Sequence, residues 1–156
     1  MGHFATTEIR PTYVPERYQF RRRFDGAGAA GFRRDRGDQS TLVYTRGLEH
    51  SDATNPLVIH ASPRARQELD GTEGQAGSQV EFGVDGVTAA YHDGMWEVDA
   101  AVAAELPDGE TALTWRTGAA HSVTVWTSHH TVAVRAPASV SREQLVEVAR
   151  SLPIVR

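Results

Sequence analysis

The sequence predicts an α+β domain: a largely antiparallel meander sheet packed against a C-terminal amphipathic helix. Short stretches of alternating apolar and polar residues recur along the chain, and turn-forming sequences such as Asp85-Gly86 separate them. A capped amphipathic segment follows the last of these stretches. Strands followed by one helix are typical of a helix that covers an antiparallel sheet, not of alternating βαβ units.

The composition is that of a globular protein. The 156 residues are 40% hydrophobic and 23% charged, which is enough to bury a core. We expect an extended lead-in at residues 1–17 and a single domain that spans residues 11–156. The chain has no cysteine, which excludes disulfides and thiolate catalysis. All 16 basic residues are arginine, a bias that we attribute to a GC-rich genome.

The chain opens with a proline-containing segment and a first strand. Pro11 and Pro15 favour an extended conformation over a helix. The strand is predicted at Tyr18–Phe24, where Arg22 interrupts the apolar alternation. The apolar phase of this strand holds Tyr18, Phe20 and Phe24.

Two further strands lie between loops. A glycine- and arginine-rich loop at residues 25–40 is expected to be flexible. Strands are predicted at 41–46 and 57–62. Residues 63–78 are expected to form a loop that accommodates a helical turn near 65–69.

Val80–Tyr91 predicts a β-hairpin. Asp85-Gly86 is a strong signal for a type I′ turn, which requires positive φ at both positions. This turn would pair Val84 with Val87, Phe82 with Ala89, and Val80 with Tyr91, so that one face of the hairpin is entirely apolar.

The next segment is less regular. A turn is predicted at His92–Gly94, before a strand at 95–98. The alanine-rich residues 99–106 fit either a short helix or a strand edge, and both readings stay open. Pro107–Gly109 predicts another turn, because proline presets φ at the second turn position.

Hydrophobic phase sets the register of the last three strands. A three-residue loop at Thr117–Ala119 is predicted, because a two-residue loop would place Val123 and Val125 on the wrong face. A four-residue loop follows at Thr127–His130. The predicted pairs are Trp115 with His121, Leu113 with Val123, Thr111 with Val125, Val125 with Val132, and Val123 with Val134.

The final helix is predicted to begin after Ser141. The Ser141 side chain can cap Gln144 in a capping box, and Val140 with Leu145 matches the flanking hydrophobic staple. Pro153 ends the helix. The apolar face of the helix holds Leu145, Val148, Ala149 and Leu152.

Several short segments together carry a resemblance to a known family. They are Pro11–Tyr18, Thr41–Tyr44, Val80–Tyr91, Ala112–Trp115 and Glu143–Leu152. In this order they resemble a bacterial domain family of unknown function found in the extracytoplasmic part of anti-sigma-factor-like and lipoprotein-like membrane proteins. That family has glycine where this chain has Arg17, and it carries a membrane helix upstream that this sequence lacks. The resemblance implies a sensor-like or carrier-like module and transfers no catalytic residue.

Histidines are the first candidates for a chemical site, because imidazole is a common metal ligand. No histidine pair has the helical spacing of zinc peptidases, so no metal site is predicted; His92, His121 and the loop with His129 and His130 would supply one if it existed. Gly26–Gly31 matches a dinucleotide-binding glycine pattern, but no long helix follows it, so a loop is predicted. Without a catalytic motif, we expect a non-enzymatic protein that needs no cofactor.

An arginine-rich segment is the most strongly charged feature. From Arg17 to Arg36, seven arginines and two aspartates give a local charge of +5, in a chain of net charge −4. Such a segment suits an anion, an anionic membrane surface or an acidic partner, whereas the pI of 5.9 argues against nucleic acid. The candidate residues for this surface are Arg21, Arg23, Arg33, Arg34 and Arg36.

Trp126 is the main residue of a second candidate site. Its register places it on the sheet face away from Val125, so it is the tryptophan most expected at a contact surface. With His129 and His130 in the following loop, it is a candidate contact for a ligand or a partner.

The expected function is a non-enzymatic binding or sensory module that acts through a protein partner. One alternative is a carrier that holds a lipid or another apolar ligand between sheet and helix. Another is an arginine-mediated binder of anionic membrane surfaces or of nucleic acid, the latter being less favoured. The expected location is extracytoplasmic if an upstream membrane or signal segment was removed, and cytoplasmic otherwise.

Overall fold

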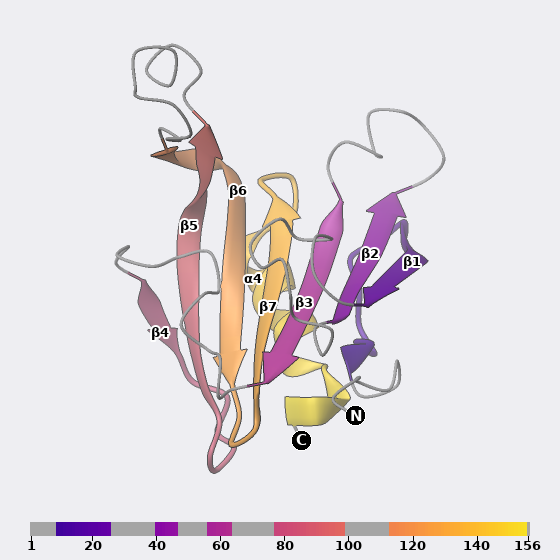
Figure 1. Ribbon diagram of the computed structural model, residues 1–156, viewed down its shortest axis with the longest axis vertical. Coiled ribbons are helices and arrows are strands. Elements are labelled where there is room, and N and C mark those ends of the chain that lie inside the picture. The colour runs from indigo at the N-terminus through magenta and orange to yellow at the C-terminus, as the bar shows by residue number, and fades with distance from the viewer. Residues whose placement is uncertain (1–8, 26–39, 47–55, 64–76, 99–112, 156) are drawn as a thin grey trace.

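The described residues form one open, seven-stranded antiparallel sheet with a helix on one face (Figure 1). The computed structural model describes residues 9–25, 40–46, 56–63, 77–98 and 113–155. The strands lie in the order β1-β2-β3-β7-β6-β5-β4. Their bounds are β1 Tyr18–Asp25, β2 Ser40–Arg46, β3 Leu57–Pro63, β4 Ser78–Val80, β5 Thr88–Val98, β6 Leu113–Trp126 and β7 His130–Pro137. Helix α4, Arg142–Arg150, and the 3-10 turn η2, Pro153–Val155, follow β7.

The antiparallel sheet and the C-terminal helix are therefore confirmed. β2 and β3 match the predicted strands to within one residue. α4 begins as predicted: the Ser141 hydroxyl accepts a hydrogen bond from the Gln144 backbone N–H at 3.1 Å, and the Gln144 side chain accepts from the Ser141 N–H at 2.9 Å. This capping box satisfies two backbone donors that the helix itself cannot pair.

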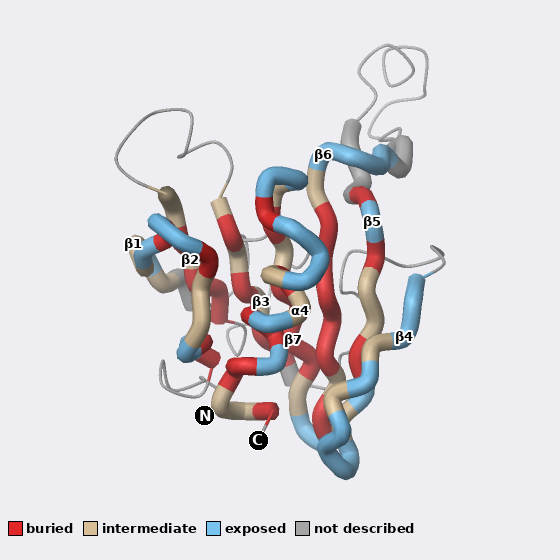
Figure 2. The backbone as a smooth tube through the Cα atoms, turned by 180° about the vertical axis from the view of Figure 1, so that it is seen from behind, coloured by how far each residue is buried: buried red, intermediate tan, exposed pale blue. Residues whose placement is uncertain are grey.

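One hydrophobic cluster joins α4 to the sheet. In Figure 2, seen from behind, α4 lies in front of the central strands, and we call the side that it covers the α4 face. Alternate residues of β6 and β7 point to this face because strand side chains alternate between the two sides. The fully buried members of the cluster include Leu42, Leu57, Ile59, Val123, Val125, Val132, Val134, Leu145, Val148 and Leu152.

A β-bulge explains the interrupted alternation of β1. Phe20 pairs with Tyr44, but Arg22 pairs with Val43, so Arg21 is an extra residue opposite β2. After the bulge Phe24 pairs with Thr41. The prediction that Phe24 shares the phase of Tyr18 and Phe20 is therefore wrong, because one inserted residue reverses the phase of all that follow.

The hairpin between β4 and β5 forms, but with another register. Val80 pairs with Ala89 instead of Tyr91, a shift of two residues that preserves the predicted faces. The Val87 N–H donates to the Val84 carbonyl at 3.2 Å. Asp85 is not among the described residues with positive φ, whereas Gly83 has φ of 71°. A turn therefore forms at Asp85-Gly86, where Gly86 has φ of 78°, but the type I′ prediction is wrong because Asp85 lacks the positive φ that this type requires.

Two predicted turns are instead irregularities inside long strands. β5 continues through His92–Gly94, and its pairing with β6 jumps between Asp93 and Met95. β6 likewise continues through Thr117–Ala119. His121 therefore pairs with Asp93 and Ala136, and Trp115 pairs with Trp96, which overturns the predicted pairs Trp115 with His121, Leu113 with Val123, and Thr111 with Val125.

The β6–β7 hairpin agrees with the prediction. Val125 pairs with Val132 and Val123 with Val134 across a turn that begins at Thr127. The Thr127 N–H donates to the His130 carbonyl at 2.9 Å and closes this turn.

The lead-in contacts the far end of the chain. Residues 10–17 carry no helix or strand. The Thr12 N–H donates to the Ser151 carbonyl at 3.4 Å, and the Tyr13 N–H donates to the Ser151 hydroxyl at 3.1 Å. Ser151 also ends α4, so the lead-in and the helix terminus are fixed together.

Some predictions fall outside the described residues. These are the loop 26–39 with Arg33, Arg34 and Arg36, the possible helical turn at 65–69, the segment 99–106 and the turn at 107–109.

Candidate functional site

A surface groove lies between the outer strand β4 and helix α4. We call it the β4–α4 groove; its volume is about 440 Å³. β4 and the residue after it supply Gln79, Val80 and Glu81. α4 supplies Arg142, Glu143, Val146, Glu147 and Arg150.

The spacing along α4 explains why this helix lines the groove. Arg142, Val146 and Arg150 recur every four residues, so they lie on one side of the helix. Leu145 and Val148, between them in sequence, are fully buried against the sheet. The helix thus buries one face and presents a second, mixed face toward β4.

Both arginines are positioned by aromatic rings of the β4–β5 hairpin. The Arg142 guanidinium lies 4.5 Å from the ring centre of Tyr91, and that of Arg150 lies 5.3 Å from the ring centre of Phe82. Cations over ring faces are held by the ring quadrupole. These two contacts connect the helix to the hairpin at either end of the groove.

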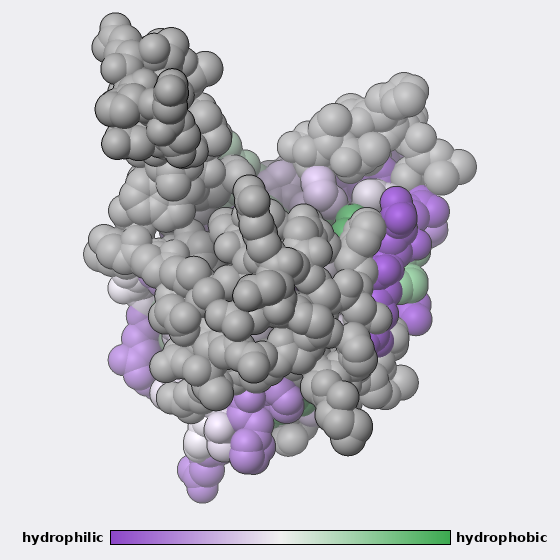
Figure 3. Space-filling model, viewed as in Figure 1, coloured by the Kyte–Doolittle hydropathy of each residue, from purple (hydrophilic) through white to green (hydrophobic). Residues whose placement is uncertain are grey.

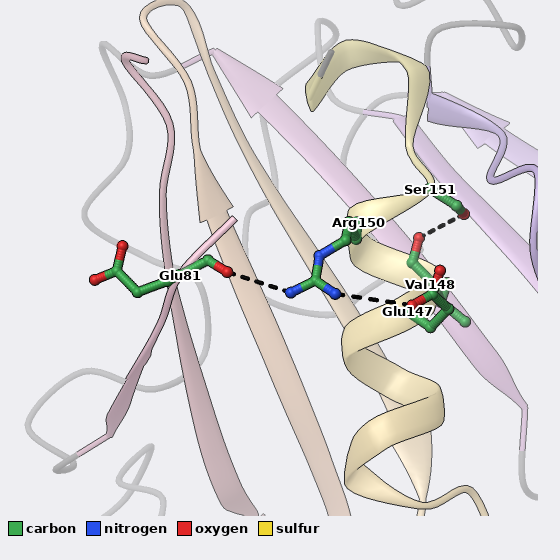
Figure 4. A network of polar contacts seen from close by, with 5 residues as sticks. All are labelled: Glu81, Glu147, Val148, Arg150 and Ser151. Carbon is green, nitrogen blue, oxygen red and sulfur yellow. Dashed lines mark hydrogen bonds and ion pairs between the residues drawn. The ribbon is translucent and has the colours of Figure 1, made fainter. Parts of the chain in front are cut away.

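Arg150 also makes polar contacts across the groove (Figure 4). It donates a hydrogen bond to the Glu81 backbone carbonyl at 3.2 Å and lies 3.9 Å from the Glu147 carboxylate. The ion pair is half-exposed and contributes little by itself. The contact with the Glu81 carbonyl joins residues 69 positions apart and fixes the width of the groove.

The charges that face the groove are mixed. Two glutamates and two arginines of α4 balance one another, and Glu81 faces the groove with its backbone carbonyl while its carboxylate points away from the helix (Figure 4). The Glu81 carboxylate accepts a hydrogen bond from Gln79 at 3.0 Å. Glu143 is exposed and makes no hydrogen bond or ion pair with the described residues. Since Glu147 lies near Arg150 and the Glu81 carboxylate is hydrogen-bonded to Gln79, Glu143 is the lining glutamate without a paired carboxylate among the described residues.

The sheet face opposite α4 is buried and polar. On it the Thr41 hydroxyl and the His60 Nδ1 atom lie 2.7 Å apart. Burial, with the nearby Arg135 charge, lowers the pKa of His60 to about 4. Three more hydroxyls of this face, those of Ser122, Thr124 and Thr131, are buried and have no hydrogen-bond partner among the described residues.

The predicted arginine surface is placed only in part. Arg21 donates to the Thr45 hydroxyl at 2.8 Å and Arg23 to the Ser40 hydroxyl at 3.2 Å, so both connect β1 to β2. Figure 3 shows hydrophilic residues along the side of the molecule where β1 lies. Arg33, Arg34 and Arg36 lie outside the described residues.

The structure places the two loop histidines next to each other, in the turn that follows Trp126. Trp126 pairs with Thr88 and Thr131 on the face opposite α4, as its register predicts, and it is half-buried. The Thr127 hydroxyl accepts hydrogen bonds from the backbone N–H groups of His129 and His130. The two imidazole rings are 6.3 Å apart, centre to centre.

The other two candidate histidines lie elsewhere in the sheet. His121 lies on the α4 face, where Tyr91 Oη is 2.8 Å from its Nδ1 atom and burial lowers its pKa. His92 pairs with Ser122, on the opposite face. Among the described residues, no group of three or more His, Asp or Glu side chains is placed to hold a metal ion.

Sequence reasoning did not identify the β4–α4 groove. β4 and α4 are more than 60 residues apart, and only the folded sheet order brings them together. One feature of the sequence could have indicated the groove. Arg142, Val146 and Arg150 recur every four residues, on a side of the helix other than the apolar face that packs against the sheet.

In the described part of the chain, no helix combines the length and apolar character that a bilayer crossing requires. Comparisons with family models, with curated proteins and with solved structures return no match. The resemblance noted in the sequence therefore stays a prediction.

Proposed function

We propose that this chain is a non-enzymatic binding module that acts through a protein partner, and that an extended segment of the partner pairs with the outer edge of β4 and extends side chains into the neighbouring β4–α4 groove. The observation that carries this proposal is the position of β4. Within the described residues it is an outer strand, and the groove lies directly beside it.

An outer strand supports binding through its backbone. Its outward N–H and C=O groups have no neighbouring strand among the described residues, so they can pair with an added strand. Ser78 and Gln79 are exposed, and Val80 is half-buried at the groove floor. A bound segment would gain backbone hydrogen bonds from β4 and side-chain contacts from α4.

The apolar-carrier alternative receives less support. Between sheet and helix, Val123, Val125, Leu145, Val148 and Leu152 are fully buried in one cluster. Side chains buried against one another in a single cluster are typical of a close-packed core, which disfavours an apolar ligand there. The β4–α4 groove, in contrast, is lined mostly by polar side chains.

Peptide binding followed by amide NMR tests the proposal. The probes are two nine-residue peptides, one alternating valine with lysine and the other alternating valine with glutamate. We expect at least one of them to shift the backbone amides of Ser78–Val80 more than those of β1. If neither peptide shifts the β4 amides at millimolar concentration, the proposal is wrong.

A variant that fills the groove provides the second part of this test. Val146→Trp should abolish the β4 shifts, because the indole occupies the groove. Val84→Trp is the matched control, since Val84 is 37% exposed and does not line the groove. Circular dichroism should show that both variants stay folded.

A further inference from the structure

We infer that β4 and the two residues after it, 78–82, open from the sheet as one unit, and that the Arg150 side chain is the latch that holds this unit closed. We call residues 78–82 the β4 segment. In the closed state β4 pairs with β5; in the open state this pairing is lost while α4 and the other described strands stay folded. The inference goes beyond the proposed function, because it concerns a motion that needs no partner.

The β4 segment has few contacts with the sheet. Among the described strands, Ser78–Val80 pairs with β5 alone. Ser78 and Gln79 are exposed, whereas Val80 and Phe82 are half-buried and pack against the outside of the core cluster. Segments with few buried contacts open locally at a lower free energy than core strands do. Pairing with β5 therefore holds the segment only weakly.

Arg150 joins this segment to α4 (Figure 4). Its Nη2 atom donates to the Glu81 backbone carbonyl at 3.2 Å, and its guanidinium lies 5.3 Å from the ring centre of Phe82. On the helix side, its Nη1 atom lies 3.9 Å from the Glu147 carboxylate. One side chain thus gives the β4 segment both a charge-assisted hydrogen bond and a cation–π contact.

The helical end of this bridge is fixed. Val148 and Ala149, the two residues before Arg150, are fully buried. The Ser151 hydroxyl donates to the Val148 carbonyl at 2.8 Å, and the Ser151 N–H donates to the Glu147 carbonyl at 3.0 Å. When the contacts of Arg150 break, the β4 segment is therefore the part that moves.

The connection from the β4 segment to β5 provides a hinge. Residues 83–86 are all exposed. Among the described residues, no atom lies within 4 Å of the position that a Cβ would take at Gly83 or Gly86. An exposed connection with two glycines can change its backbone angles at little cost. Opening at this connection leaves the pairing of β5 with β6 intact.

Native-state amide hydrogen exchange, measured without any peptide, tests the latch. In the parent chain, the slowest amide of Ser78–Val80 should exchange about a hundredfold faster than the amides of β6 and β7, because it exchanges by local opening. Arg150→Met keeps the apolar stem of the side chain and removes its charge and its donors. We expect this variant to exchange the β4 amide about tenfold faster than the parent.

Two controls separate local opening from a general loss of stability. Arg142→Met makes the same change at the other end of α4, where the guanidinium contacts Tyr91 of β5, and should leave the β4 amide nearly unchanged. Ile59→Ala weakens the core, so it should speed exchange in β6 and β7 but not in β4, since the contacts of Ile59 persist in the open state.

A second variant tests the same latch without a change in the helix. Phe82→Leu removes the ring beneath the Arg150 guanidinium and should also speed exchange of the β4 amide several-fold. The double variant should exchange more slowly than the product of the two single effects predicts, because both variants remove one shared contact.

The outcomes distinguish this inference from the proposed function. If the β4 amide exchanges as slowly as those of β6 and β7, or if Arg150→Met does not speed it, the latch is wrong whether or not a peptide binds. If exchange follows the expected pattern but neither peptide of the previous section shifts the β4 amides, the latch stands and the binding function fails. A peptide that does bind should slow exchange in β4, because only the closed segment presents its edge.

Discussion

At the scale of single residues, two threonines on the face opposite α4 differ in one respect. The Thr41 hydroxyl lies 2.7 Å from His60 Nδ1, whereas the Thr124 hydroxyl is buried and has no hydrogen-bond partner in the described part of the chain. A buried hydroxyl that loses water without gaining a partner costs roughly 1–3 kcal/mol. The same side chain is therefore expected to stabilise one position and to cost stability at the other.

Substitution by valine, which has nearly the same shape, separates the two cases. Thr124→Val should raise the free energy of unfolding by about 1 kcal/mol, because it removes an unpaired hydroxyl. Thr41→Val should lower it by a similar amount, because it leaves His60 unpaired. Urea unfolding measures both. A loss of stability in Thr124→Val would indicate that its hydroxyl has a partner after all.

His60 makes stability depend on pH. Its folded-state pKa of about 4 lies below the ordinary value of 6.5, because burial and Arg135 disfavour the charged ring. As the pH falls below 6.5, the unfolded chain binds the proton first, so stability decreases down to about pH 4. The contribution is at most on the order of 3 kcal/mol.

The pH prediction is tested on the slope and not on absolute stability. His60→Gln should flatten the dependence of the unfolding free energy on pH between 4.5 and 7. Ser128→Gln, at an exposed residue that does not titrate, should leave the slope unchanged. Equal slopes in His60→Gln and the parent chain would contradict the assignment.

At the scale of elements, the capping box is the clearest example of a local pattern that fixes structure. Ser141 and Gln144 satisfy each other's backbone N–H groups at the start of α4. Ser141→Ala should lower the free energy of unfolding by about 1 kcal/mol. Ser139→Ala, two residues earlier and exposed, should change it by only a few tenths. A comparable loss in both variants, measured by thermal unfolding, would rule out the cap as the cause.

Such elements were predictable from sequence because their contacts are local. The capping box joins residues three apart, and the β6–β7 hairpin is set by a short loop between clearly alternating strands. The strands and the C-terminal helix could therefore be located before their neighbours were known.

Other elements depend on partners that sequence does not reveal. Gly94 and Gly118 both adopt positive φ, which favours a turn and a bulge equally. Both lie at the point where the pairing between β5 and β6 shifts its register. There the Gly118 N–H donates to the Asp93 carboxylate at 3.3 Å. Pairing between distant strands decides the outcome, so two bulges were predicted as turns. The β4–α4 groove escaped prediction for the same reason.

At the scale of the whole molecule, one strand pair joins two groups of strands. β1, β2 and β3 form one run and β7, β6, β5 and β4 form the other, and β3 pairs with β7 between them. Ile59 and Val134 face each other at this junction, and both are fully buried. Damage at this junction should therefore affect both halves at once.

Ile59→Ala is expected to lower the free energy of unfolding by about 2–5 kcal/mol, as cavity formation in a packed core does. Circular dichroism and tryptophan fluorescence should still report one coincident transition. Val84→Ala, at a position 37% exposed, should cost less than about 0.5 kcal/mol. Two separated transitions in Ile59→Ala would show that the halves unfold independently.

The two outer strands of the described sheet are unlike each other. β1 carries a bulge and three consecutive arginines, devices that discourage strand addition, whereas the sequence of β4, Ser-Gln-Val, carries no charge and β4 adjoins the β4–α4 groove. If binding occurs by strand addition, this asymmetry limits the valency of the protein to one. Complexes would then saturate at a 1:1 ratio. They would not propagate into fibres, since only one edge of each sheet accepts an added strand.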